Sequence, residues 1–235
     1  GHSNTGVGHQ ALANHTTGSN NVGFGYNAGV NITTGDTNSA FGKEALNTCT
    51  TGTNHTAIGH DALGAVTNGN SNVAVGDQAG STVTTGSNNL LLGTSSGTSS
   101  SPSHITTGDN RIVLGNNSIT NAHIKVDWTV TSDARDKMNF ASVPHGLSFV
   151  NDLQPFKFDF KKSRDDATPH GTTKYGFKAQ DILALEGDNP IIINNEDEDN
   201  LKVTNSHLIP VLVKALQELS AKNDALEARL TTLEG

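Results

Sequence analysis

The sequence predicts a mainly β protein: a β-roll of repeats seventeen residues long, then a small α+β domain that ends in a coiled-coil helix. Three observations support this prediction: glycines recur at a fixed interval, the composition changes after residue 110, and leucines near the end occupy heptad positions. We expect four parts, namely a repeat region, a connecting strand or neck, a mixed α+β domain and a terminal helix. Their expected boundaries are residues 1–110, 111–131, 132–205 and 206–235.

Two series of glycines define the repeat. The first series comprises Gly8, Gly25, Gly42, Gly59, Gly76 and Gly93, and the second comprises Gly18, Gly35, Gly52, Gly69 and Gly86. The spacing is 17 residues in both, and the next pair, Gly108 and Gly115, follows an insertion around Ser99–Ser103. Seventeen residues are too few for a helical hairpin, and turns rich in Gly and Asn beside β-branched residues favour short strands. We therefore expect each repeat to give two short strands and two turns, about one coil of a β-roll.

The expected core of each coil is small. An apolar residue precedes each glycine of the first series, as Phe41 precedes Gly42, and an alanine such as Ala45 often follows three residues after the glycine. One large side chain and one alanine per coil give a core too thin to offset the conformational entropy of a free-standing solenoid. Three chains packed together would bury apolar faces that one chain leaves open, so we expect a homotrimer.

Two stretches of the repeat carry a resemblance to a known family. Asn72–Ala79 (NVAVGDQA) and Ser39–Ala45 (SAFGKEA) resemble the head repeats of YadA-like trimeric adhesins, although those repeats are shorter. The resemblance covers about residues 3–98 and implies a left-handed β-roll assembled as a trimer. Similar repeats also occur in phage fibres, so the resemblance leaves open whether the owner is a cell surface or a virion.

Beyond the repeat, the chain is expected to run extended from residue 119 to residue 130, a stretch that contains Trp128, the single tryptophan. A serine and a lysine follow, five residues apart, at Ser132 and Lys137. A serine hydroxyl is a weak nucleophile until a base takes its proton, and a lysine is such a base only when its amine is neutral. Burial lowers a lysine pKa towards neutrality.

We therefore regard Ser132 and Lys137 as candidate catalytic residues that act on the carbonyl of Thr131. The residues expected to position this loop or to polarise that carbonyl are Asp133, Arg135 and Asp136. The alternative is a polar turn with a surface lysine and ordinary ion pairs.

Four motifs in order resemble the intramolecular chaperone domain of phage endosialidases and other tail fibres. They are Thr131–Phe140, Leu153–Phe158, Tyr175–Asp181 and Leu208–Leu216. The resemblance implies a single self-cleavage between Thr131 and Ser132, by a serine peptidase with no other substrate. The chain departs from the commonest pattern at Asp136, where an apolar residue is frequent, and at Asn205–His207, which replace an expected tyrosine segment.

Within this domain, alternating phenylalanines at Phe156–Phe160 predict a half-buried strand, and the polar stretch Ser163–Thr173 predicts a loop. A helix is expected over Ala179–Leu185, a short buried strand at Ile191–Ile193 and a solvated turn at Glu196–Asp199.

The terminal helix, expected over residues 206–233, carries a heptad pattern. Its a positions are Ile209, Leu216, Asn223 and Leu230, and its d positions are Leu212, Leu219, Leu226 and Leu233. This pattern is typical of a homo-oligomeric coiled coil in which Asn223 fixes the register. Leucine at both positions does not choose between two and three strands, so the expected trimer rests on the repeat and the resemblance. The alternative is a helix packed only on its own domain.

Composition excludes several classes of protein. The formal net charge is −8 and the basic residues are scattered, so nucleic acid is not an expected partner. No apolar run is long enough to insert into a membrane, and no cofactor is expected. The lone Cys49 is expected to be a packed thiol. The histidines His9, His15, His55 and His60 are expected to be exposed side chains rather than metal ligands.

Together these features predict the distal tail-fibre protein of a bacteriophage, located in the virion, whose chaperone part is released in the host cytoplasm during assembly. Its expected partner is a host-surface receptor, either a glycan or an outer-membrane component. The alternative is a fragment of a bacterial trimeric adhesin with a permanent trimerisation cap. Two other functions fit the sequence less well. An ice-binding face would need regular Thr-x-Thr pairs, which the chain lacks, and a membrane-anchored transcription factor would need a basic domain upstream.

Overall fold

The computed structural model describes residues 1–234. The chain divides into two compact units, Gly1–Asn121 and Ala122–Gly235. Each unit is described by itself.

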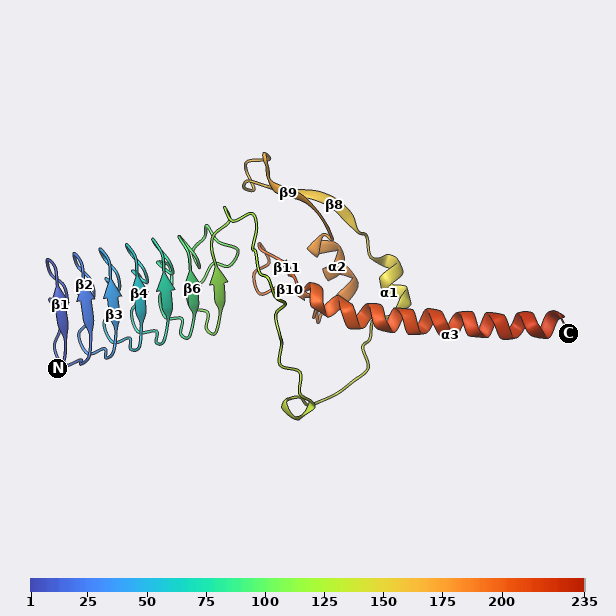
Figure 1. The fold of residues 1–235 in the computed structure, drawn as a ribbon, viewed down its shortest axis with the longest axis horizontal. Coiled ribbons are helices and arrows are strands. Elements are labelled where there is room, and N and C mark those ends of the chain that lie inside the picture. The colour runs from blue at the N-terminus through green and yellow to red at the C-terminus, as the bar shows by residue number, and fades with distance from the viewer. Residues whose placement is uncertain (235) are drawn as a thin grey trace. The chain divides into compact units, whose positions relative to one another are not determined.

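The first unit is a parallel β-solenoid with one strand per coil (Figure 1). Its strands are β1 (Thr5–Val7), β2 (Val22–Phe24), β3 (Ser39–Phe41), β4 (Thr56–Ile58), β5 (Val73–Val75), β6 (Leu90–Leu92) and β7 (Ile112–Leu114). They pair in chain order, so that Phe24 is aligned with Phe41 one repeat later. Leu92 pairs with Leu114 across the longer interval that contains the insertion. The expectation of two strands per coil is wrong, because turns and bends form the rest of each coil.

The solenoid core is built from other residues than expected. The middle residue of each strand from β2 to β7, for example Ala57, is buried, whereas Phe24 and Phe41, which precede glycines, are 56% and 40% exposed. Successive side chains in a strand point to opposite faces, so a buried middle residue turns its neighbour outward. The predicted inward position of the residue before each glycine is therefore wrong.

Leucine, isoleucine and valine side chains from the turns supply the bulk of this core. They include Leu12, Ile32, Leu46, Leu63, Val66, Val83 and Ile105, and they pack with the predicted alanines Ala28, Ala45, Ala62 and Ala79. One coil therefore fills its own interior better than the sequence suggested. The row of large side chains that remains outside is the apolar surface that the solenoid leaves for association with other chains.

The glycines of the first series allow the coils to stack closely. Gly25 has a φ of +136°, and a Cβ at this position would lie 2.6 Å from the carbonyl oxygen of Gly42 in the next coil. Only glycine fits such a conformation at such a separation, which explains why the residue returns in every coil.

A ladder of buried asparagines runs through the solenoid. Its members Asn21, Asn38, Asn72 and Asn89 come one per coil and are essentially inaccessible to solvent. Asn38 shows the pattern: its backbone N–H donates to Oδ1 of Asn21 (2.9 Å), and its Nδ2 donates to the carbonyl oxygen of Gly52 (2.8 Å). Each side chain thus satisfies backbone groups that the turns leave unpaired.

His55 occupies one rung of this ladder, so the expectation that it is exposed is wrong. Its Nδ1 accepts from the backbone N–H of Asn72 (3.2 Å), and Nε2 faces the carbonyl oxygen of Gly69 at 2.7 Å. These partners assign the proton to Nε2, and burial lowers the pKa of His55. Cys49 is buried nearby, as predicted, and burial raises its pKa to about 11.

The second unit contains short elements and one long helix (Figure 1). Its helices are η1 (Ala134–Asp136), α1 (Leu147–Asp152), α2 (Ala179–Glu186), η2 (Asn205–His207) and α3 (Leu208–Glu234). Two antiparallel pairs of strands complete it: β8 (Phe156–Lys161) with β9 (Pro169–Gly176), and β10 (Ile193–Asn194) with β11 (Lys202–Val203). The core consists of Phe149, Ile182, Ile192, Ile193, Leu208 and Val211.

Several expectations for this unit need correction. The predicted loop over Ser163–Thr173 ends early, because β9 begins at Pro169 and pairs with β8. Strand β8 is confirmed, but Phe160 is exposed rather than half-buried. Ile191 is also exposed and lies outside β10. The helix over Ala179–Leu185 and the turn over Glu196–Asp199 are confirmed.

Candidate active site

The side chains of Ser132 and Lys137 lie in direct contact. Nζ of Lys137 donates a hydrogen bond of 2.6 Å to Oγ of Ser132. The chain between them turns through the short helix η1, which brings positions five residues apart in the sequence together. The sequence-predicted pair is thus brought together in one loop, and both residues are exposed.

Asp133 and Arg135 hold this loop in shape. Asp133 caps η1 by accepting the backbone N–H of Arg135 on Oδ1 (2.9 Å). The Arg135 guanidinium donates back to the same carboxylate, with the shortest contact 2.6 Å from Nη2 to Oδ2. These bonds from Arg135 lower the pKa of Asp133. Because Arg135 is engaged by Asp133, the geometry places both residues in the positioning of the loop.

Asp136 and Thr131, the other residues expected at this site, lie beside the pair. Asp136 forms the end of η1, and its backbone N–H donates to the carbonyl oxygen of Asp133 (3.1 Å). Thr131 directly precedes Ser132 and is exposed. Among the described residues 1–234 its side chain has no hydrogen-bond partner, and its carbonyl precedes the backbone nitrogen of Ser132.

The contact of 2.6 Å is short enough for proton transfer between the hydroxyl and the amine. A lysine in water is protonated at neutral pH and then donates to the hydroxyl instead of accepting its proton. In this exposed loop the arrangement is a hydrogen-bonded polar turn that contains a nucleophile and an amine in contact.

Helix α3 carries two apolar stripes, of which one is open to solvent. Leu208, Val211 and Ala215 are buried against the unit's own core. The eight predicted heptad residues form the other stripe, here called the heptad stripe, and all are solvent-exposed. They are Ile209, Leu212, Leu216, Leu219, Asn223, Leu226, Leu230 and Leu233. The idea that α3 packs only on its own domain fails to account for this second stripe.

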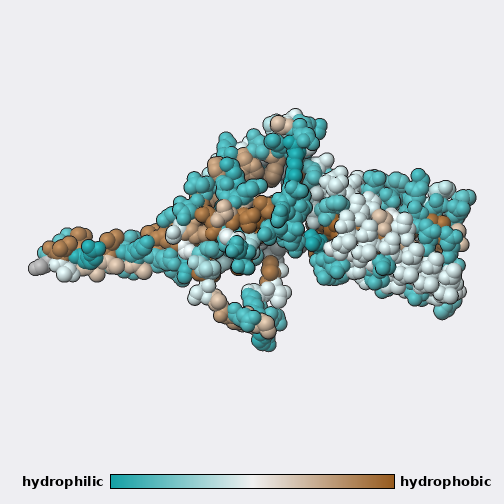
Figure 2. Space-filling model, turned by 180° about the vertical axis from the view of Figure 1, so that it is seen from behind, coloured by the Kyte–Doolittle hydropathy of each residue, from teal (hydrophilic) through white to brown (hydrophobic). Residues whose placement is uncertain are grey.

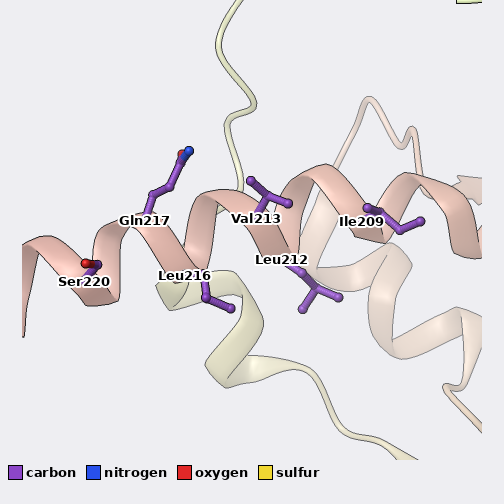
Figure 3. A pocket seen from close by; sticks show the side chains of 6 residues that line it. All are labelled: Ile209, Leu212, Val213, Leu216, Gln217 and Ser220. Carbon is purple, nitrogen blue, oxygen red and sulfur yellow. The ribbon is translucent and has the colours of Figure 1, made fainter.

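The figures show the open stripe directly. Brown apolar patches follow the projecting length of α3 in Figure 2. At its N-terminal end, Ile209, Leu212, Val213 and Leu216 line a shallow apolar depression together with two polar residues of the same helix (Figure 3). An apolar helix face of this length in water is typical of a helix that has a partner.

A contact between α1 and α3 was missed from the sequence. Oε2 of Glu218 accepts the backbone N–H of Leu147 (2.7 Å) at the start of α1. Gly146 precedes that helix, and a Cβ there would collide with the Glu218 carboxylate. The two partners are seventy-one positions apart, so no local sequence signal indicates the pair.

Within residues 1–234, no three His, Cys, Asp or Glu side chains cluster closely enough to bind a metal ion. None of the helices in the same residues has the length and apolar content of a bilayer-spanning segment.

Comparison with known proteins identifies one part of the chain. Residues 132–188 match the family model described as chaperone of endosialidase. The match begins at Ser132 and includes the Ser132–Lys137 loop, α1, α2 and the strands β8 and β9. It covers less than half of the chain and does not extend to the solenoid. No curated protein and no solved structure matches the chain.

Proposed function

We propose that the chain is an oligomeric fibre with a built-in folding chaperone that removes itself by cleavage between Thr131 and Ser132. The observation that carries the proposal is the hydrogen bond between Lys137 and Ser132 at the first residues of the segment that matches the chaperone of endosialidase family. A serine and a lysine in contact at the start of such a segment can act as the nucleophile and the base of a cleavage reaction.

The proposed reaction needs only the chain and water. Neutral Lys137 takes the hydroxyl proton of Ser132, and Oγ attacks the carbonyl carbon of Thr131. The C–N bond between Thr131 and Ser132 breaks as the lysine returns the proton to the leaving nitrogen, which leaves an ester on Oγ. Water then hydrolyses the ester, giving a carboxylate at Thr131 and a free amino group at Ser132. Each chain cuts itself once.

Assembly would switch this reaction on. The Ser132–Lys137 pair is exposed in the single chain, and a lysine becomes a base when neighbouring chains exclude water from it. The heptad stripe is one surface for such assembly. A second is the apolar row of the solenoid, which consists of Val7, Phe24, Phe41, Ile58, Val75, Leu92 and Leu114. Cleavage would then report that the chains have packed correctly, most simply as a homotrimer.

The biological role proposed for the fibre is attachment of a bacteriophage to its host. The solenoid would remain in the virion and contact a host-surface glycan or outer-membrane component, while the chaperone part would be released in the host cytoplasm during assembly. The resemblance of residues 3–98 to fibre and adhesin repeats, together with the chaperone match, supports this role.

A bacterial adhesin with a permanent trimerisation cap is the second candidate. One observation favours it: both Ser132 and Lys137 are exposed to water. The bonds between Asp133 and Arg135 fix their loop whether or not a reaction takes place. In that case the loop is a plain polar turn and the terminal helix stays attached.

Intact mass measurement of the purified chain, with Ser132→Ala and Lys137→Ala as variants, separates the candidates. The proposal expects wild type to split between Thr131 and Ser132 and both variants to stay whole. A matched control is Ser142→Ala, a serine outside the loop, which should split like wild type. Intact wild type in a folded oligomer would exclude self-cleavage and favour the permanent cap.

A further inference from the structure

The segment directly before the cleavage position, residues 122–131, has the pattern of a strand without being one. Here it is called the connecting segment. Apolar side chains occupy alternate positions at Ile124, Val126, Trp128 and Val130, and polar residues stand between them. In an extended chain such alternation places all four apolar side chains on one face. The segment instead carries a bend at Lys125 and Val126 and belongs to no sheet.

Within residues 1–234, the connecting segment has no hydrogen-bond partner and its apolar side chains are mostly exposed. The four apolar residues are 54–79% exposed. Among residues 1–234, no backbone N–H from residue 122 to residue 131 donates to another backbone group. Unpaired backbone beside an unburied apolar face is what a strand presents before it pairs with another strand.

We propose that the connecting segments of neighbouring copies pair with one another, parallel and in register, and bury this apolar face between them. Parallel in-register pairing places each apolar residue at the level of its own counterpart. On the polar face it places Lys125 diagonally opposite Asp127 of the adjacent copy, and this attraction offsets the repulsion between the like charges that stand at the same level. Pairing thus buries the apolar face and gives hydrogen-bond partners to the backbone.

The exposed apolar surface extends past the connecting segment. Beyond Lys137 the chain carries two further exposed apolar residues, Met138 and Phe140, which are 80% and 74% exposed. Burial of the aromatic side chains of Trp128 and Phe140 alone would remove roughly 300–500 Å² of surface per copy from water. Stable interfaces bury about 800 Å² per partner, so these two side chains would supply a large part of such a contact.

The pairing would also complete the proposed cleavage site, and this part of the inference rests on the proposed function. Val130 lies just before the Ser132–Lys137 pair and Met138 just after it, so the pair stands between two apolar stretches that pairing would bury. The reactive site is then incomplete in one chain. Copies of the connecting segment exclude water from Lys137 and hold the Thr131 carbonyl beside the serine.

Trp128, the single tryptophan, is a natural probe of the pairing. The full-length Ser132→Ala chain, which lacks the nucleophile, allows the pairing to be measured without cleavage. We expect its oligomer, identified by native mass, to show blue-shifted emission and several-fold weaker quenching by iodide than the urea-unfolded chain. An oligomer whose Trp128 is quenched as freely as in the unfolded chain would overturn the inference, and so would a folded monomer.

A matched pair of variants links pairing to cleavage. Val126→Asn places a polar amide on the apolar face and Thr129→Asn places one on the polar face, and the exposure of both positions indicates that the single chain tolerates either change. We expect Val126→Asn to lose the shielding of Trp128 and, with Ser132 present, to stay whole, whereas Thr129→Asn keeps both properties. Shielding and cleavage that survive in Val126→Asn would overturn the inference but leave self-cleavage intact. Shielded Trp128 in a wild-type chain that never cleaves would support the pairing and refute self-cleavage.

Discussion

At the Ser132–Lys137 pair, the position of a proton decides between a structural hydrogen bond and a reactive nucleophile. The two atoms are 2.6 Å apart, and the Asp133–Arg135 bonds already fix the loop that joins them. In the proposed reaction, assembly would therefore need to remove water rather than to move the loop far.

Lys137→Arg tests whether the amine acts as a base. Arginine keeps the positive charge and can donate to the Ser132 hydroxyl, but its guanidinium does not lose a proton in proteins. We expect self-cleavage to slow by at least about a hundred-fold, the usual contribution of a general base. The rate is measured from the intact mass of the chain over time, with oligomeric state as the control. Cleavage at the wild-type rate would show that the side chain only positions the serine.

His55→Asn tests the buried rung of the asparagine ladder. Burial lowers the pKa of His55 in the folded state, so below an unfolded value of about 6.5 the unfolded chain binds more protons than the folded one. The stability that neutral His55 contributes is therefore complete above that pH. It is lost as the pH falls through the folded value, by at most about 1.4 kcal/mol per pH unit.

Asparagine restores the residue that the other rungs use, so His55→Asn should flatten this acid dependence. Urea unfolding at a series of pH values measures it, and the exposed His104→Asn serves as the control. Equal acid sensitivity in the His55→Asn and wild-type chains would show that other groups cause it.

Among the structural elements, the coils of the solenoid depend on glycine at every first-series position. In Gly25→Ala, the new Cβ would meet the Gly42 carbonyl oxygen of the next coil, and the φ of +136° is strained for alanine. We expect a loss of stability of about 1–3 kcal/mol or more, seen as a lower midpoint in urea. Thr34→Ala, at an exposed position of the same coil, should change stability by less than about 0.5 kcal/mol. Equal effects of the two variants would contradict close stacking.

Helix α3 carries a buried apolar stripe and the exposed heptad stripe on different faces. Leu226→Asp places a charge on the heptad stripe at a solvent-exposed position. We expect it to dissociate the oligomer and to abolish cleavage while leaving the short elements folded, because a charge in a coiled-coil core is poorly tolerated. Light scattering and intact mass are the measurements. Ala228→Asp, on the opposite side of α3, should leave both properties unchanged, and dissociation by both variants would argue against a specific heptad interface.

Elements with a local signal were predicted well, and elements defined by distant contacts were not. Helix α2 ends at Gly187, whose positive φ gives it a clear stop, and α3 follows from its heptads. The period of the solenoid was visible in its glycines. A period does not tell which residues of a strand face inward, since a shift of one residue turns every side chain to the opposite face. That ambiguity placed Phe41 inside and left the asparagine ladder and His55 unrecognised.

For the whole molecule, the two units share one property, which is that each leaves apolar surface without a partner. The solenoid fills its own core and still exposes the apolar row, and the second unit exposes the heptad stripe and the connecting segment. The Ser132–Lys137 contact could be predicted because both residues belong to one short motif. The Glu218–Leu147 bond that ties α1 to α3 could not, because it joins distant parts of the chain.

The central claim is that a removable chaperone builds an oligomeric fibre and then leaves it, and native mass spectrometry of the purified full-length chain tests this most directly. We expect two products, residues 1–131 as a stable trimer and residues 132–235 released from it, with Ser132→Ala giving one uncut trimer. A chain that remains whole, or a cut product in which residues 1–131 fall apart to monomers, would contradict the account.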